Sequence, residues 1–300
     1  MDPPTPLDPF ESSRTSWSHA IGGNAPLTAP VLLAVALTTI SACSSQMERD
    51  RVARDGREAR PWVATDASLD SDTGCRIATR LFRPSRPGTD ALVVLGPGFL
   101  RDQRHMQGLA EALAAVGVPT ATLDFCNSRP WEGRPVQNGR DMRRVAERFG
   151  ARRVVYGGFS AGGLSALAAA WADTDAVGVL ALDLVDDRGL GAGLARTLEL
   201  PLVGLRGDSA PCNAWSNGLA VYGASPDARV TPIPGASHCD FESPTDWLCE
   251  AVCGAPDSGS EDRRREIIAR ALAEVTGLLG IEQRGWRPGE TRTGPPGPDD

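Results

Sequence analysis

The sequence predicts an α/β fold, in which a mainly parallel central sheet is flanked by helices. Short apolar segments typical of buried strands alternate along the chain with segments of helical spacing, which is the order of βαβ units. Of the 300 residues, those between 71 and 281 carry this pattern. That length suits one large α/β domain better than two small ones.

The predicted strands lie at residues 76–82, 91–95, 120–125, 153–156, 177–182, 200–205 and 229–233. Residues 91–95 form a continuous apolar run, as expected for a strand covered on both faces. Between the strands, apolar residues recur at helical spacing or alanine dominates. These segments predict helices at residues 102–116, 142–149, 164–171 and 261–279.

The N-terminal 43 residues resemble a signal peptide that ends in a bacterial lipobox. Residues 29–40 are apolar but too few to span a bilayer comfortably, and small residues then lead to Cys43, the predicted lipidation site. The segment before them departs from a signal peptide, because it carries three acidic residues against a single Arg14. A start codon further downstream would explain this departure. The alternative is an apolar segment of a folded cytosolic domain.

The remaining terminal segments are polar. Residues 44–70 are predicted to form a charged tether, and residues 282–300, rich in proline, glycine and charge, a disordered tail. We therefore expect an exported protein of the bacterial cell envelope that faces the periplasm or the exterior and is attached to the membrane through lipid on Cys43.

Cysteine content agrees with export. Apart from Cys43 the chain has six cysteines, and an even number in an exported protein favours up to three disulfides. They are Cys75, Cys126, Cys212, Cys239, Cys249 and Cys253. A zinc site is the alternative, but the chain has no Cys-x-x-Cys pair and only three histidines.

Charge and composition exclude several classes of function. The net charge is −7 and no basic run is flanked by aromatic residues, so no nucleic-acid partner is expected. All 31 basic residues are arginine, which excludes a Walker-type phosphate lysine, a Schiff-base lysine and a Ser–Lys dyad. Nothing in the sequence indicates an oligomeric state.

The candidate nucleophile is Ser160, in the sequence Gly158-Phe159-Ser160-Ala161-Gly162. A serine hydroxyl is a poor nucleophile unless a base accepts its proton and donors hold its oxyanion. A tight turn from strand to helix provides both conditions, and this segment lies between an apolar strand and an alanine-rich helix. The alternative is a glycine turn without catalytic function.

The candidate base is His238. Of the other histidines, His19 lies in the predicted signal peptide and His105 in a predicted helix before the nucleophile. His238 follows the last predicted strand, which gives the chain order nucleophile, acid, histidine of α/β hydrolases. No long insertion precedes it, so a large lid is not expected. The alternative is an exposed loop histidine.

Two aspartates are candidates for the acid that orients the imidazole. Asp183 ends one predicted strand and Asp208 follows the next. For the oxyanion, the N–H groups of Phe99, in the loop Leu95-Gly96-Pro97-Gly98-Phe99, and of Ala161 are the candidate donors. An ordinary glycine turn is the alternative for that loop.

These motifs resemble the α/β-hydrolase branch that contains chlorophyllases, platelet-activating-factor acetylhydrolases and polyester-degrading cutinases. The resemblance covers residues 75–250 and rests on residues 98–100, 109–114 and 158–163. Leu182-Asp183-Leu184-Val185-Asp186 is similar to a segment of chlorophyllase-like proteins whose aspartate is the catalytic acid, which favours Asp183. The cutinases place the acid where this chain has Asp208.

The same resemblance has departures and further implications. Pro97 stands where the family has histidine in its oxyanion loop. The segments Cys212-Asn213 and His238-Cys239-Asp240-Phe241-Glu242, with Cys249 and Cys253, resemble a bacterial exported subgroup. Cys239 beside the candidate base suggests a disulfide that fixes the histidine loop.

The function expected is hydrolysis of a small or polymeric carboxylic ester, without cofactor or metal, through an acyl-enzyme on Ser160. One alternative is an exported peptidase or thioesterase with the same triad. Another is a binding or scaffolding lipoprotein that retains the fold without turnover.

Overall fold

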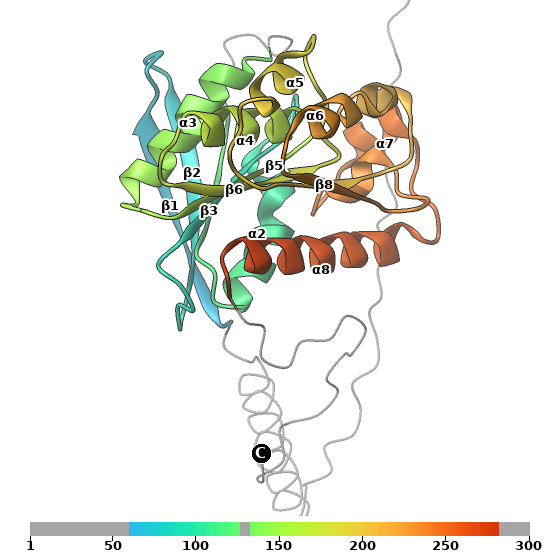
Figure 1. Ribbon diagram of the computed structural model, residues 1–300. Helices are drawn as coiled ribbons and strands as arrows, with labels where there is room; N and C mark the ends of the chain where they lie inside the picture. The colour runs from blue at the N-terminus through green and yellow to red at the C-terminus, as the bar shows by residue number, and fades with distance from the viewer. Residues whose placement is uncertain (1–59, 127–132, 282–300) are drawn as a thin grey trace, which may run out of the picture. The chain divides into compact units, whose positions relative to one another are not determined.

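The computed structural model describes residues 60–126 and 133–281, which contain an eight-stranded sheet with helices on both faces (Figure 1). The strand order is β1-β2-β4-β3-β5-β6-β7-β8. The first two, β1 (Trp62–Asp70) and β2 (Arg76–Pro84), form an antiparallel hairpin, and β2 is also antiparallel to β4 (Thr120–Leu123).

All other neighbouring strands are parallel, which confirms the predicted mainly parallel sheet. These strands are β3 (Leu92–Gly96), β5 (Val154–Phe159), β6 (Ala176–Leu182), β7 (Leu202–Arg206) and β8 (Ala228–Pro232). Because parallel strands end at the same edge of the sheet, the loops after β3, β5, β6, β7 and β8 lie along one edge. Ligands of α/β proteins bind at that edge.

Side chains alternate between the two faces of the sheet and build two apolar clusters. In β3, Leu92 and Val94 belong to one cluster, whereas Val93 and Leu95 belong to the other. The first cluster packs against α3 (Pro135–Arg148), α4 (Ala161–Trp171), α5 (Leu190–Ala195) and α6 (Leu219–Ala224). The second packs against α2 (Gln107–Ala115) and α8 (Ser260–Leu278), on the opposite side of the sheet in Figure 1.

Strand β1 corrects one predicted boundary. Residues 62–70 were expected in the tether of residues 44–70, but they pair with β2 along their whole length. β1 is an edge strand with mostly exposed side chains, so it lacks the apolar pattern by which a strand is predicted. The folded domain therefore includes residues 62–70. The other predicted tether residues, the signal peptide with Cys43 and the tail of residues 282–300 lie outside the described residues.

The predicted helices are present with altered boundaries. The segment 102–116 is divided into a 3₁₀ helix, η1 (Gln103–Met106), and α2, and α3 begins at Pro135 rather than at residue 142. Five shorter helical elements were not predicted, since each is too short for a periodic pattern. They are α5, η2 (Pro211–Ser216), α6, η3 (His238–Phe241) and α7 (Trp247–Cys253). Within the described ranges, no helix is both long and apolar enough to cross a membrane.

The six cysteines of the domain form three disulfides: Cys75–Cys126, Cys212–Cys253 and Cys239–Cys249. Their Cα–Cα distances of 6.1, 5.6 and 5.9 Å are ordinary for disulfides. The sulfurs of Cys239, Cys249 and Cys253 lie within 4.8 Å of one another, but each is in a disulfide and is not a thiolate ligand. This cysteine chemistry does not fit the zinc alternative.

Candidate active site

Ser160 occupies the tight turn between β5 and α4. Its backbone angles, φ 55° and ψ −121°, are unfavourable for a residue with a side chain and persist only where the surroundings enforce them. Positions 158 and 162, before and after Ser160, both require glycine. A Cβ atom at Gly158 would lie 2.3 Å from the carbonyl oxygen of Gly162, and one at Gly162 would lie 2.3 Å from that of Pro97. The two glycines thus allow the close approach that presents the serine hydroxyl.

Ser160, His238 and Asp183 form a continuous hydrogen-bonded series. The His238 Nε2 atom lies 3.0 Å from Ser160 Oγ, and its Nδ1 atom lies 2.6 Å from Asp183 Oδ2. All three residues are at least nine-tenths buried. The ring of Phe159 packs against the imidazole with the centroids 4.5 Å apart. The structure therefore brings together three residues that lie far apart in the sequence, at the edge where the parallel strands end.

Asp183 is held by more than the imidazole. It has a φ of 43°, and the N–H of Gly207, after β7, donates to its Oδ1 at 2.9 Å. The side-chain amide of Asn213 lies 3.3 and 3.4 Å from the two carboxylate oxygens. In this arrangement Oδ2 of Asp183 faces His238, and the hydrogen bonds stabilise the negative charge of the carboxylate.

Asn213 was missed by the sequence analysis. It is fully buried, and its Oδ1 atom accepts hydrogen bonds from the N–H groups of Ala210 and Ser216. Its Nδ2 atom also donates to the carbonyl of Asp208. The sequence offers only one signal, an asparagine beside Cys212 shortly after a strand, and that signal does not distinguish a buried support from a turn residue.

The alternative acid, Asp208, is in a different position. Its side chain is exposed, and Oδ2 accepts the N–H of Gly235 at 3.1 Å. Gly235 lies three residues before His238, so the carboxylate of Asp208 contacts the loop that leads to the histidine. The imidazole itself is hydrogen-bonded to Asp183. The geometry selects Asp183 as the acid partner.

The two candidate oxyanion donors lie beside Ser160. Ala161 is the first residue of α4, so its N–H has no partner within the helix and lies at the positive end of the helix dipole. Phe99, Ser160 and Ala161 line one hollow of about 630 Å³. A carbonyl bound at Ser160 from this hollow therefore has both residues as neighbours.

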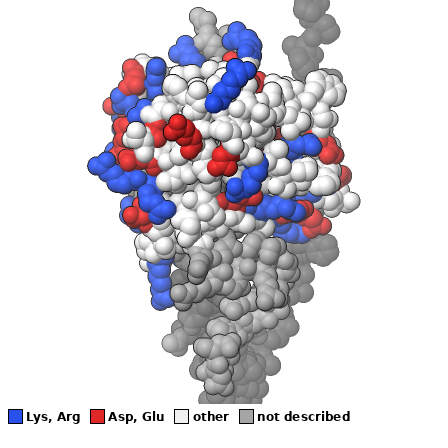
Figure 2. All heavy atoms as spheres, in the orientation of Figure 1, with Lys and Arg blue, Asp and Glu red and all other residues white. Residues whose placement is uncertain are grey.

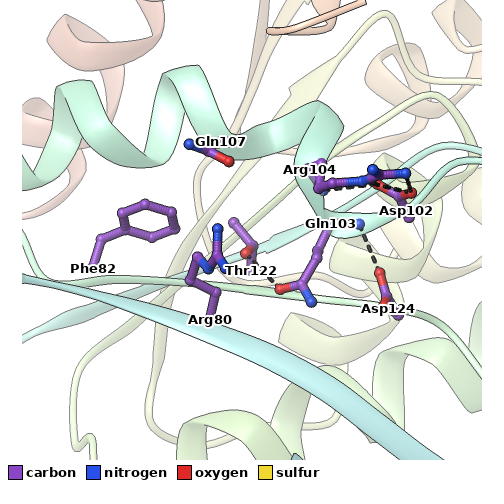
Figure 3. A pocket seen from close by; sticks show the side chains of 8 residues that line it. All are labelled: Arg80, Phe82, Asp102, Gln103, Arg104, Gln107, Thr122 and Asp124. Carbon is purple, nitrogen blue, oxygen red and sulfur yellow. Dashed lines mark hydrogen bonds and ion pairs between the residues drawn. The ribbon is translucent and has the colours of Figure 1, made fainter. Parts of the chain in front are cut away.

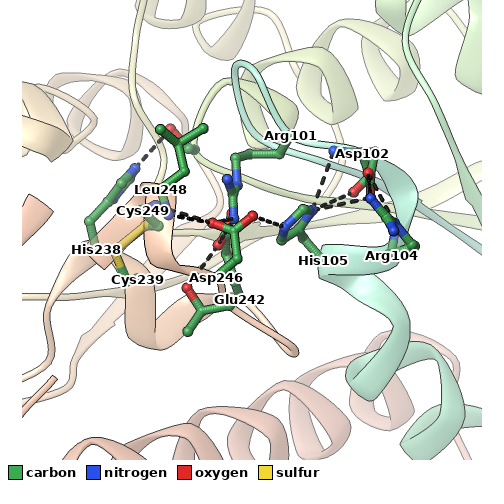
Figure 4. Close-up of polar contacts among 12 residues, drawn as sticks. Arg101, Asp102, Arg104, His105, His238, Cys239, Glu242, Asp246, Leu248 and Cys249 are labelled. Atoms are coloured by element: carbon green, nitrogen blue, oxygen red, sulfur yellow. Dashed lines mark hydrogen bonds and ion pairs between the residues drawn. A yellow bond between two sulfur atoms is a disulfide. The ribbon is translucent and has the colours of Figure 1, made fainter. Parts of the chain in front are cut away.

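A second hollow, of about 450 Å³, also reaches Ser160 and is largely apolar. Its apolar lining includes Phe99, Leu100, Phe159, Pro211, Leu248 and Val252, and Ser160 and His238 also face it. Leu248 and Val252 come from α7, which two disulfides attach to η2 and η3. One of these, Cys239–Cys249, begins directly beside His238 (Figure 4). The sequence-based expectation of a disulfide at the histidine loop is thus confirmed.

A third hollow does not include the triad and is polar (Figure 3). Its charged and polar groups pair mainly with one another: Arg104 with Asp102, and the N–H of Gln103 with Asp124. Burial raises the pKa of Asp124. On the face shown in Figure 2, arginines and acidic residues are interspersed, as in these local pairs.

No family model and no curated protein matches the sequence. Solved structures match its fold. The esterase domain of a Rhodothermus marinus protein is 16% identical, with a TM-score of 0.52 over 70% of this chain and 96% of its own. An α/β serine hydrolase homologue from Coxiella burnetii is 17% identical, with a TM-score of 0.54 over 70% and 97%. A putative dienelactone hydrolase from Klebsiella pneumoniae is 17% identical, with a TM-score of 0.52 over 71% and 99%.

At this identity the likeness establishes the fold, and the chain has the α/β-hydrolase fold. The serine, acid and histidine follow β5, β6 and β8 in the order in which α/β hydrolases place their triad.

The choice between the two aspartates can be tested without knowing a substrate, by the rate at which a fluorophosphonate labels Ser160. Asp183→Asn should lower this rate by about 10⁴-fold, because the imidazole loses the partner that fixes its tautomer and stabilises its charge. Asp208→Asn should lower it less than about tenfold, since Asp208 contacts only the loop. Ser160→Ala is the control for labelling at the expected residue. A larger loss in Asp208→Asn than in Asp183→Asn would contradict the assignment.

Proposed function

We propose that the protein is a serine hydrolase that cleaves carboxylic esters through an acyl-enzyme intermediate. The observation that carries the proposal is the series Ser160–His238–Asp183, with distances of 3.0 and 2.6 Å, at a strained turn from strand to helix. Similarity of fold to proteins described as an esterase, a serine hydrolase homologue and a putative dienelactone hydrolase supports it.

In the first step, Ser160 Oγ attacks the ester carbonyl while His238 Nε2 takes its proton. Asp183 stabilises the imidazolium that forms and holds the ring in the tautomer that leaves Nε2 free to accept. The N–H groups of Phe99 and Ala161 donate to the carbonyl oxygen as it becomes an oxyanion. Each such preorganised donor raises the rate by about 10²–10³-fold.

In the second step, the imidazolium gives its proton to the leaving alkoxide, and the alcohol departs. Water then enters, His238 removes a proton from it, and the resulting attack releases the acid and regenerates Ser160. Because His238 moves every proton and Ser160 carries the acyl group, the proposed cycle needs neither an organic cofactor nor a metal.

The two hollows that meet at Ser160 support an ester with an apolar portion as substrate. The 450 Å³ hollow offers apolar side chains next to the nucleophile, and several of these remain exposed, among them Leu100 at 55% and Val252 at 71%. An open apolar site accommodates short-chain esters as well as segments of a polymeric ester. We propose these two as the substrate classes.

The ester proposal is tested with p-nitrophenyl esters of increasing acyl length, using oxidised protein that lacks residues 1–43. Turnover should be highest for short acyl chains, which fit within the 450 Å³ hollow, and Ser160→Ala should lower it to the background rate of hydrolysis. The measurement is kcat/KM for each ester from the release of p-nitrophenol.

Equal turnover by wild type and Ser160→Ala would exclude Ser160 as the nucleophile. A folded wild type that cleaves peptides or thioesters but no oxygen ester would replace the esterase proposal by one of the alternatives. Strong activation on long-chain triglyceride droplets would argue against an open site for short or polymeric esters.

We further propose that the protein belongs to an exported, lipid-anchored subgroup of the chlorophyllase, acetylhydrolase and cutinase branch. Three disulfides support an oxidising compartment, since such bonds are rare in the cytosol. The anchor rests on the sequence around Cys43, outside the described residues.

Cys43→Ser tests the anchor. The variant should move from the membrane fraction to the soluble fraction of the envelope, because it loses the acyl chains that hold the protein to the bilayer. The measurement is fractionation with immunodetection, with Cys75→Ser, whose cysteine lies in the folded domain, as the control for loss of a cysteine. Continued membrane association of Cys43→Ser would exclude lipidation at this residue.

A further inference from the structure

The loop that contains Phe99 is a strained turn. Residues Gly98 to Arg101 form a four-residue turn closed by a hydrogen bond of 3.2 Å from the N–H of Arg101 to the carbonyl of Gly98. Leu100, in its third position, has a φ of 59°. Turns with a positive φ there favour glycine or asparagine, and this conformation is strained for a leucine. Contacts outside the turn must therefore hold it.

Arg101 provides such contacts. Its side chain is 7% exposed, and its guanidinium pairs with both carboxylate oxygens of Glu242, at 2.5 and 2.7 Å (Figure 4). A second ion pair, of 2.8 Å, joins it to Asp246. The side chain of Glu242 is fully buried, so its carboxylate needs the guanidinium of Arg101 to compensate for the loss of contact with water. The guanidinium fork matches both oxygens at once, which a lysine ammonium does not do.

Both acidic partners belong to the segment that carries His238. Glu242 directly follows η3, whose first residue is His238, and Asp246 caps α7 by accepting the N–H groups of Leu248 and Cys249. Hydrogen bonding to Arg101 is the largest cause that lowers the pKa of Asp246 below its usual range. The Arg101 guanidinium therefore joins the turn of Phe99 to the segment of His238.

The sheet does not set the distance between these two segments. The turn follows β3 and the histidine segment follows β8, and three strands, β5, β6 and β7, lie between them. Two backbone hydrogen bonds, from Ser243 to His105 and from Gly108 to Ser243, join the histidine segment to η1 and α2, beyond the turn. From the turn of residues 98–101, the side chain of Arg101 makes the link to the histidine segment.

From this geometry we infer that Arg101 is a positioning residue. Its ion pairs with Glu242 and Asp246 fix the place of the Phe99 N–H relative to His238, so that the oxyanion donor and the base act on one carbonyl group. This inference rests on the proposed function. Oxyanion donors must lie 2.7–3.1 Å from the developing charge, and a displacement of about 1 Å costs about 10²-fold in rate.

The chain offers a matched control. Arg263 pairs with Asp240 at 2.9 Å, and Asp240 also lies in η3 and is almost completely buried. This pair joins the histidine segment to α8 and leaves the turn of Phe99 untouched. Loss of Arg101 removes the ion pair of the buried Glu242 carboxylate, and loss of Arg263 leaves the buried Asp240 carboxylate with Arg264 at 4.0 Å. Both losses lower stability, but only loss of Arg101 frees the turn.

The experiment compares Arg101→Met and Arg263→Met. For each variant it measures KM and kcat, with the active sites counted by fluorophosphonate titration. It also measures the affinity for a trifluoromethyl ketone, whose tetrahedral adduct on Ser160 places an oxyanion between the two donors. Arg101→Met should lower kcat by about 10²-fold and weaken the ketone by a similar factor, while KM changes less than about threefold. Arg101→Lys should retain a larger part of kcat than Arg101→Met, and Arg263→Met should stay within about threefold of wild type.

The double variant Arg101→Met, Glu242→Gln separates positioning from stability, because it also removes the unpaired buried charge. It should regain the thermal midpoint lost in Arg101→Met but not the lost kcat. Recovery of kcat with stability, or equal losses in the two Arg→Met variants, would overturn the inference. Failure of the proposed function would be seen in wild type itself, as absence of ester turnover. The rate of fluorophosphonate labelling of Ser160 would then still compare the two variants.

Discussion

The site depends on the close contact of β5 and α4 at Ser160, which glycines at positions 158 and 162 permit. Backbone hydrogen bonds hold the turn in its unfavourable conformation: the N–H of Ser160 donates to Leu182 at 2.8 Å, and that of Val185 donates to Ser160 at 3.4 Å. Leu182 and Val185 flank Asp183. The contacts that enforce the strained conformation of Ser160 therefore also place Asp183, and the strain is tolerated because the residues after β6 pack against the turn.

The position of His238 is fixed by side-chain contacts rather than by backbone hydrogen bonds of the sheet. His238 lies in η3, beyond the last strand of the sheet, where ladder hydrogen bonds no longer fix the chain. The disulfide of Cys239 and the ion pair of Glu242 follow it directly. Each joins a residue near His238 to α7 or to the turn of Phe99, in place of strand pairing. His238, the proposed base, thereby acquires the fixed position that proton transfer requires.

The sequence was informative where a function depends on local pattern. The strand, the Gly-Phe-Ser-Ala-Gly turn and the helix are adjacent in the chain, so Ser160 could be found, and His238 followed from the small number of histidines. Asp183 and Asp208 both follow strands that end at the same edge, and only the fold shows which carboxylate reaches the imidazole. Arg101 has no local signal and Asn213 only an ambiguous one, because their contacts span 141 and 30 positions in the sequence. The edge strand β1 was missed because its side chains are mostly exposed and show no apolar alternation.

The proposed hydrolysis depends on covalent acylation of Ser160. This step is tested by mixing the protein with a p-nitrophenyl ester, quenching the reaction with acid within the first turnover, and locating any added mass by peptide mass spectrometry. We expect one acyl group per molecule, on Ser160, which accumulates before steady state and is absent from Ser160→Ala. Ester turnover without a covalent intermediate, or with the acyl group on another residue, would contradict it.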